Sequence, residues 1–207
     1  MEFRYLTGFT RHFLLLLPAW LLLAMTACKK TPAEQTPEAP RISAAKVIEL
    51  AHKPLKYGKD FNLDLNADGR NDLLFKVNHV AYDLNTKVKF SFLVYSTSTS
   101  RIAVNTGTEA VPVFTKGQQV SIDNFSGFEW YPAIINVLSE KNLDGGAGNW
   151  TGPFSSTDRR YLPIQLLQAG KYHTGWLELS TDQENAQVVL HRAGIAIEAD
   201  MDVRAGE

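Results

Sequence analysis

The sequence is short of the residues that build many familiar sites. It has one cysteine, Cys28, among 207 residues, so neither an internal disulfide nor a multi-cysteine zinc site can form. It contains no Gly-x-Ser-x-Gly nucleophile elbow and no His-Glu-x-x-His metalloprotease motif. The glycines of residues 144–153 lack the lysine and helix that follow a phosphate-binding loop. These absences argue against nucleotide binding and against the commonest hydrolytic chemistries.

Charge of one sign and long helical patterns are also lacking. The chain carries 21 Lys and Arg against 22 Asp and Glu, a net charge of −1 at pH 7. Without a basic surplus, nucleic acid is not a favoured partner. No stretch of 15 residues keeps apolar side chains at helical spacing, which argues against a Rossmann-type or α/β-hydrolase enzyme.

The N-terminus has the pattern of an export signal. A basic start precedes the apolar run of residues 13–25, which is too short to span a membrane and is typical of a signal-peptide core. The run ends in LAMTAC, which resembles the lipobox of bacterial lipoproteins. The resemblance implies that residues 1–27 are a signal peptide and that Cys28 is acylated, palmitate included. The alternative is an ordinary signal peptide with an incidental cysteine.

A tether is expected after the cysteine. Residues 29–41 are rich in Pro, Glu and Thr and contain no large apolar side chain, so they cannot join a core. Thirteen extended residues reach about 40 Å. We therefore expect residues 28–42 to be the lipidated cysteine and its tether, and residues 43–207 to be one folded domain. The lipid anchor implies a place on a bacterial membrane outside the cytoplasm, in the outer membrane or at the cell surface.

A nine-residue stretch, DLNADGRND, has the pattern of a cation loop. Side-chain oxygens fall at positions one, three, five and nine, with glycine at position six. It resembles the short calcium loops of FG-GAP and thrombospondin type 3 repeats; an EF-hand would need a carboxylate where Phe75 stands. We expect one structural Ca²⁺, and the bare alternative is a polar turn between strands. The expected ligands are Asp64, Asn66, Asp68, the Arg70 carbonyl and Asp72.

The remaining pattern is that of an all-β protein. Apolar and polar residues alternate most clearly over residues 87–95. Residues 43–51 also fit helical spacing, but we favour a strand because the rest is β-like. The short spacing predicts a single antiparallel β-sandwich, either jelly-roll or immunoglobulin-like. The other strands are expected at residues 61–65, 102–104, 110–114, 120–122, 161–167, 173–179 and 188–197, with another following the cation loop.

The last third carries a second resemblance. The segments YLPI from residue 161, GKYHTGWLEL from residue 170 and VVLHRAGIA from residue 188 resemble the end of a loose group of secreted bacterial proteins. Members pair an early Asp-rich loop with a late Gly-Trp strand. The group has no assigned biochemical activity, so the resemblance implies export and architecture but no reaction.

Two aromatic loops are the candidate ligand surface. Trp130 and Tyr131 lie in an aromatic stretch broken by Gly and Pro, and Trp150 lies in a glycine-rich loop. Exposed aromatic rings stack on sugars or pack on protein partners. We therefore expect a non-catalytic cell-envelope binding module for glycan or protein. The alternative reading is that these rings plug one end of the sandwich.

Two further functions stay open at this stage. A polysaccharide-acting hydrolase would need a carboxylate acid or base, for which Glu129 and Glu178 are the candidates. A purely structural envelope protein would need no site. His173 and His191 lie on neighbouring expected strands, where they can meet, although surface positions are the simpler interpretation.

Overall fold

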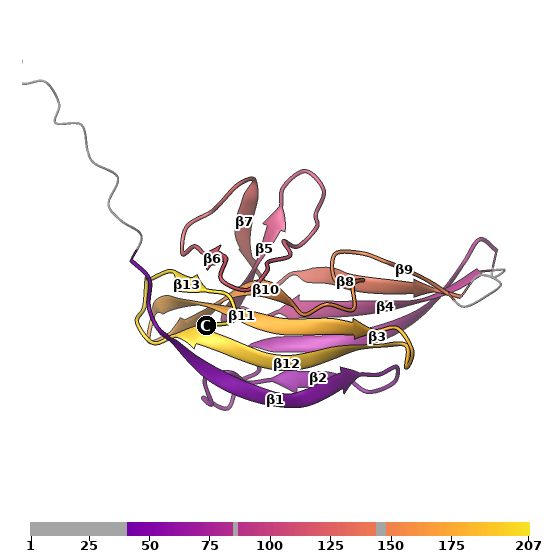
Figure 1. Cartoon of the computed structure of the whole chain (residues 1–207), viewed down its shortest axis with the longest axis horizontal. Coiled ribbons are helices and arrows are strands. Elements are labelled where there is room, and N and C mark those ends of the chain that lie inside the picture. The colour runs from indigo at the N-terminus through magenta and orange to yellow at the C-terminus, as the bar shows by residue number, and fades with distance from the viewer. Residues whose placement is uncertain (1–40, 85–86, 144–147) are drawn as a thin grey trace, which may run out of the picture. The chain divides into compact units, whose positions relative to one another are not determined.

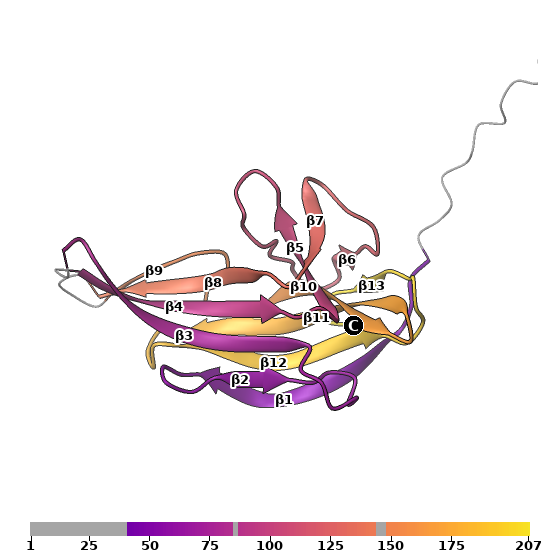
Figure 2. The ribbon, with the colours of Figure 1, turned by 180° about the vertical axis from the view of Figure 1, so that it is seen from behind.

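The computed structural model describes residues 41–84, 87–143 and 148–207. These residues form strands and turns and contain no helix. Two antiparallel sheets pack face to face, in the orders β1-β12-β11-β10-β5-β7 and β2-β3-β4-β8-β9 (Figures 1 and 2). The predicted antiparallel β-sandwich is therefore confirmed.

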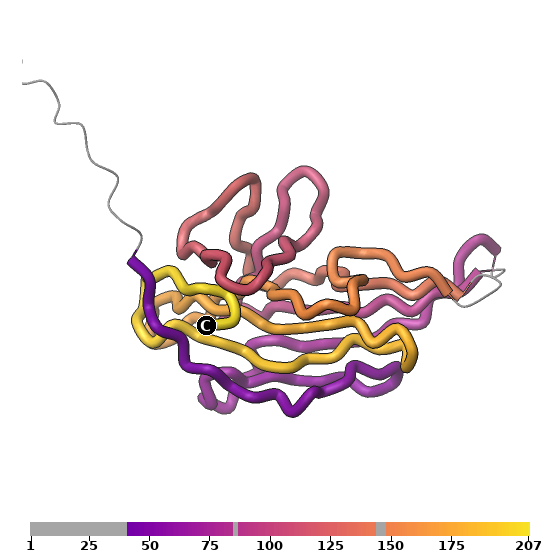
Figure 3. The backbone as a smooth tube through the Cα atoms, viewed as in Figure 1, coloured from indigo at the N-terminus to yellow at the C-terminus, as the bar shows by residue number. Residues whose placement is uncertain are grey.

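The six-stranded sheet brings the beginning and the end of the domain together, whereas the five-stranded sheet is built from the middle of the chain. In the six-stranded sheet the first strand pairs with the twelfth, so the beginning of the domain lies beside its end (Figure 3). Its strands are β1 (Ala45–Leu55), β12 (Gln187–Ala196), β11 (Lys171–Asp182), β10 (Arg160–Gln168), β5 (Ser100–Asn105) and β7 (Phe128–Pro132). The five-stranded sheet consists of β2 (Phe61–Leu63), β3 (Leu73–Tyr82), β4 (Lys87–Ser96), β8 (Ile135–Asn142) and β9 (Asn149–Thr151).

The main core lies between the sheets. Along β3, the apolar residues Leu73, Phe75 and Val77 alternate with more exposed ones, which is the period-two pattern of a half-buried strand. They pack with buried side chains of the opposite sheet, such as Leu177 and Leu179 of β11. Each fully buried side chain of this size contributes about 1.5–3 kcal/mol to stability. The core thus holds the sandwich without any disulfide.

A second core lies on the other face of the six-stranded sheet. There Trp176 is fully buried beneath a small ribbon formed by β6 (Gln119–Val120) and β13 (Val203–Arg204). Gly194 lies directly under the indole, because a Cβ at that position would come 2.3 Å from the ring. Trp176 therefore belongs to the core of the protein.

Several strand predictions need correction. Residues 125–132, expected as an irregular aromatic loop, contain β7, which pairs with β5 along its whole length. Residues 110–114, expected as a strand, make a single bridge through Phe114 instead. Strand β8 was not predicted, because its buried side chains include Asn136 and Ser139 and its exposed ones include Ile135. Of residues 43–51, all from Ala45 onward belong to a strand, β1.

The entry into the domain begins slightly before residue 43. The backbone carbonyl of Arg41 accepts a hydrogen bond from the backbone amide of Asp202, and Ile42 bridges to the same residue. The Arg41 and Ile42 backbones, expected as the last part of the tether, are therefore fastened to the C-terminal segment. Residues 1–40, which include Cys28 and the expected signal peptide, lie outside the described residues.

Candidate functional site

Strands β5 and β7 project away from the sandwich together with the loop that follows β5 and the loop that precedes β7 (Figures 1 and 2). The loop after β5 is held by Asn105, whose Oδ1 accepts hydrogen bonds from the backbone amides of Gly107 and Thr108. The amide of Glu109 donates to the Asn105 carbonyl at 2.8 Å, and Glu109 takes a positive φ of 58°. This tight turn fixes where the Glu109 side chain leaves the backbone.

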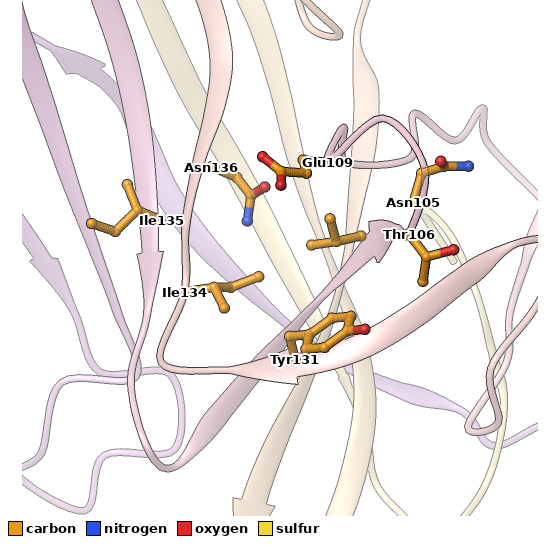
Figure 4. Close-up of a pocket in the computed structure, with 8 residues that line it drawn as sticks. Asn105, Thr106, Glu109, Tyr131, Ile134, Ile135 and Asn136 are labelled. Carbon is orange, nitrogen blue, oxygen red and sulfur yellow. The ribbon is translucent and has the colours of Figure 1, made fainter.

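A groove runs between this projecting part and the start of β8 (Figure 4). It consists of two adjoining hollows of about 280 and 380 Å³, which share Glu109, Ile135 and Asn136 in their walls. The first hollow is also lined by Val104, Asn105, Thr106, Tyr131 and Ile134. The lining therefore combines aliphatic side chains with carboxylate, amide and hydroxyl groups.

One buried polar group in the groove wall has no partner. Asn136 is 7% exposed, and its amide nitrogen makes no hydrogen bond within the described residues. In Figure 4 the Asn136 and Glu109 side chains enter the groove from opposite sides, and the Asn136 amide nitrogen is directed away from the Glu109 carboxylate. A buried N–H group without a partner costs about 1–3 kcal/mol. Because the nitrogen itself is buried, a ligand can accept its hydrogen bond only after the Asn136 side chain turns toward the groove.

Exposed apolar side chains lie along the same groove. Tyr131 is 38% exposed, Val137 is 38% exposed and Ile135 is 59% exposed. The Tyr131 hydroxyl donates to Oε2 of Glu129 at 2.8 Å, which orients the ring. This hydrogen bond, with some burial, raises the pKa of Tyr131, so the phenol stays neutral. A neutral, oriented ring beside aliphatic groups is suited to an uncharged apolar surface.

The two tryptophans expected to bind ligand are placed differently from Tyr131. Trp130 is 9% exposed, packs in the second core, and donates its indole N–H to the carbonyl of Asp123. Trp150 lies on β9, stacked on Phe92 at a ring separation of 5.5 Å. The structure therefore brings only Tyr131, of these three predicted residues, into the groove. Sequence reasoning missed Glu109, Ile135 and Asn136, whose side chains have no motif.

The predicted cation loop folds into a compact turn between β2 and β3. Both carboxylate oxygens of Asp64 accept backbone amide hydrogen bonds, from Asp68 and Gly69. Asn66 Oδ1 accepts from the Asp68 amide, and Asp68 Oδ1 accepts from the Arg70 amide. The oxygens are thus gathered on one loop. No group of three or more His, Cys, Asp or Glu side chains placed to hold a metal occurs within the described residues.

Asp72, at the ninth position, is the unusual member of this loop. Its side chain is fully buried; Oδ2 accepts the Leu65 amide at 2.8 Å, whereas Oδ1 has no partner. Burial raises the pKa of Asp72, and the charges of Asp64 and Asp68 raise it further, against the Leu65 hydrogen bond. An orphaned buried oxygen facing two like charges fits a site for a hard cation.

The two candidate catalytic carboxylates do not form a pair. Glu178 on β11 is 1% exposed, and Arg159 and Arg192 enclose its carboxylate at 2.6–2.9 Å. Glu129 lies on β7, and two strands, β10 and β5, separate the two residues. Three strand spacings amount to about 14 Å. Glycosidase carboxylates lie about 5–9.5 Å apart.

The fold is an all-β sandwich with a groove on its surface, and within the described residues Glu129 and Glu178 are not placed as an acid–base pair. Comparisons of the chain with family models, curated proteins and solved structures find no match. A helix long and apolar enough to cross a membrane does not occur among residues 41–84, 87–143 and 148–207.

Proposed function

We propose that this protein is an exported, lipid-anchored binding module of the bacterial cell envelope that holds a segment of a partner protein in the groove beside Tyr131. The observation that carries the proposal is the groove itself. It combines exposed apolar side chains with the buried, unpartnered amide of Asn136. Exposed apolar groups with a few oriented polar groups are the usual composition of a recognition site.

The lining favours a protein segment over a glycan. Sugar sites rely on broad aromatic faces, and Trp130 and Trp150 are both occupied by packing within the protein. The apolar part of the groove consists of aliphatic side chains instead, such as Ile134 and Ile135, with Tyr131 as the one aromatic ring among the described residues that line it. Aliphatic surface is best covered by apolar side chains of a partner protein.

The charge of the groove selects among protein segments. Glu109 belongs to both hollows and makes no ion pair within the described residues. A Lys or Arg next to an apolar side chain in the partner would complement it. The expected ligand is therefore an extended segment with an apolar residue adjacent to a basic one.

Two further parts of the proposal concern attachment and stability. Acylation of Cys28 would hold the protein on a membrane, and the partner would then be another envelope protein. A Ca²⁺ ion on Asp64, Asn66, Asp68, Asp72 and the Arg70 carbonyl would neutralise the carboxylates of the loop. The orphaned oxygen of Asp72 supports this ion, whose role is structural.

A peptide array tests the binding proposal. The purified protein is applied to matched peptides in which an apolar residue is flanked by Lys, by Glu or by Ser, and to a glycan array in parallel. We expect retention on the apolar–Lys peptides, and loss of it in Tyr131→Ala and Ile135→Ser. Ile197→Ser is the matched control, because Ile197 (64% exposed) is about as exposed as Ile135 (59%) but is not in the groove wall.

Three outcomes would overturn the proposal. Retention on glycans alone would favour a glycan-binding module, and no retention on either array would favour a purely structural protein. Release of reducing ends from a polysaccharide, lost on Glu129→Gln or Glu178→Gln, would establish the hydrolase instead.

A further inference from the structure

His52, His191 and Ser180 form a chain of contacts on β1, β12 and β11. The Nδ1 atoms of His52 and His191 lie 2.7 Å apart, and Nε2 of His191 lies 2.8 Å from the Ser180 hydroxyl oxygen. The two imidazole planes meet at 75° with centroids 4.9 Å apart. The pairing of His173 with His191, considered from the sequence, does not occur; His173 Nδ1 contacts the Ala196 carbonyl.

The backbone is irregular at this point in both neighbouring ladders. Between Glu49 and Lys53, three residues of β1 stand opposite the single residue His191. The ladder with β11 also shifts its register at His191. Ala51 and His52 both take a positive φ of 52°, which is uncommon for residues other than glycine. Bulges re-aim side chains, and strained backbone of this kind clusters at functional sites.

We propose that His52 and His191 are the protein ligands of a divalent transition-metal ion bound between their Nδ1 atoms. Zn²⁺ and Cu²⁺ are the ions that neutral imidazole favours. The Ser180 hydroxyl accepts the Nε2–H of His191, which leaves the lone pair on Nδ1 for the metal. This is the usual arrangement in which a second group fixes the tautomer of a metal-ligating histidine.

The geometry needs little change to admit an ion. Metal–nitrogen bonds of about 2.0–2.1 Å at angles of 90–110° place two ligand nitrogens about 2.9–3.3 Å apart. The observed 2.7 Å must therefore widen by only a few tenths of an ångström. His52 is exposed whereas His191 is 8% exposed, so the outer ring can move while the inner one stays fixed. Water would complete the coordination on the solvent side.

Three charged side chains surround His191 in addition to His52. Arg159, Glu178 and Arg192 act on it from β10, β11 and β12 or their ends. Both arginines bind the Glu178 carboxylate, so their charges are partly neutralised within the sheet. Of the two imidazoles, His52 is the one that faces solvent, and His191 is the buried one. The calcium loop offers oxygen donors, so the two ions would not compete for one site.

Metal titration of the purified full-length protein tests the site. Isothermal titration with ZnCl₂ and electron paramagnetic resonance with Cu²⁺ are measured on wild type and on single variants. We expect one ion, with copper hyperfine structure from two nitrogens. His52→Ala should weaken affinity by at least about tenfold, and Ser180→Ala by about tenfold through loss of the orienting bond.

Matched variants keep the result decisive. His79→Ala removes an exposed histidine of the other sheet and should change nothing, and Asp64→Ala should leave zinc affinity intact. Because His52 is exposed, His52→Ala is expected to fold. This variant therefore tests the site even if His191→Ala, which changes a buried residue, does not fold. Equal zinc affinity in wild type and His52→Ala, or a copper spectrum without two nitrogens, would reduce the pair to a hydrogen bond and overturn the proposal.

Discussion

Replacing Asp72 by asparagine gives opposite expected effects with and without calcium. The amide keeps an oxygen to accept the Leu65 N–H and removes a buried charge whose Oδ1 has no partner. An unsatisfied buried group costs about 1–3 kcal/mol, and more when it is charged. In EDTA, therefore, Asp72→Asn should be the more stable protein by about 1 kcal/mol, a rise in melting temperature of about 2–4 °C for a domain of this size.

Calcium should reverse the order. An extracellular loop of this kind has a dissociation constant of about 0.1–1 mM. In 10 mM CaCl₂ such a site is filled about 10- to 100-fold over, which stabilises the wild type by about 1.4–2.7 kcal/mol, or about 3–11 °C. Asp72→Asn should show little of this rise, because it loses a carboxylate ligand. The assay is thermal melting by circular dichroism in EDTA and in 10 mM CaCl₂.

The matched control is Glu198→Gln, which neutralises an exposed carboxylate elsewhere and should melt like wild type in both buffers. A wild type indifferent to calcium would reduce the loop to a polar turn. An Asp72→Asn variant less stable than wild type in EDTA would refute the account of the orphaned oxygen.

Three other changes probe packing and charge. Burial tends to raise the pKa of Glu140, but hydrogen bonds from Lys89 and Ser91 outweigh it and lower the pKa. The ionised Glu140 carboxylate therefore stabilises the fold at pH values above its ordinary pKa of 4.5, and this stabilisation is lost as the pH falls through the lower pKa of the folded state. In Glu140→Gln, the free energy of unfolding measured by urea titration should depend less on pH in this acidic range. Gly194→Ala, which forces a methyl group into Trp176, should cost about 1–3 kcal/mol or more by the same method. Glu178→Ala should cost about 1–3 kcal/mol and lower the melting temperature in low and high salt alike, whereas a surface ion pair would respond to salt.

The fold class could be predicted because alternation survives wherever one strand face is buried. Residues 87–95 alternate most clearly in the sequence, and β4 follows them closely, although residues 91–94 are buried on both faces of the strand. The aromatic stretch around Trp130 was misassigned because Gly and Pro flank it, while pairing with β5 and burial of the indole decide its conformation. Residues 110–114 have strand-like composition, but tertiary context leaves them one bridge. Propensity is weaker than packing in such short segments.

The site was less predictable than the fold. The cation loop has fixed spacing along the chain, so its residues could be identified locally. The groove brings Glu109, in the loop after β5, to the same hollow as Asn136 of β8. A bulge in β1 brings His52 against His191, which lies 139 residues further along the chain. Such long-range approaches depend on register, which no local pattern encodes. Tyr131 could be identified because it is an aromatic residue in a stretch broken by Gly and Pro, although its neighbours in the groove could not be predicted.

A charge exchange in the groove tests the proposed function most directly. The affinity of wild type and Glu109→Lys for the apolar–Lys peptide and for its apolar–Glu counterpart is measured by isothermal titration. The account predicts that wild type prefers the Lys peptide and that Glu109→Lys reverses the preference, with unchanged melting temperature. The same preference in both proteins would contradict it, because the ligand would then bind away from the groove.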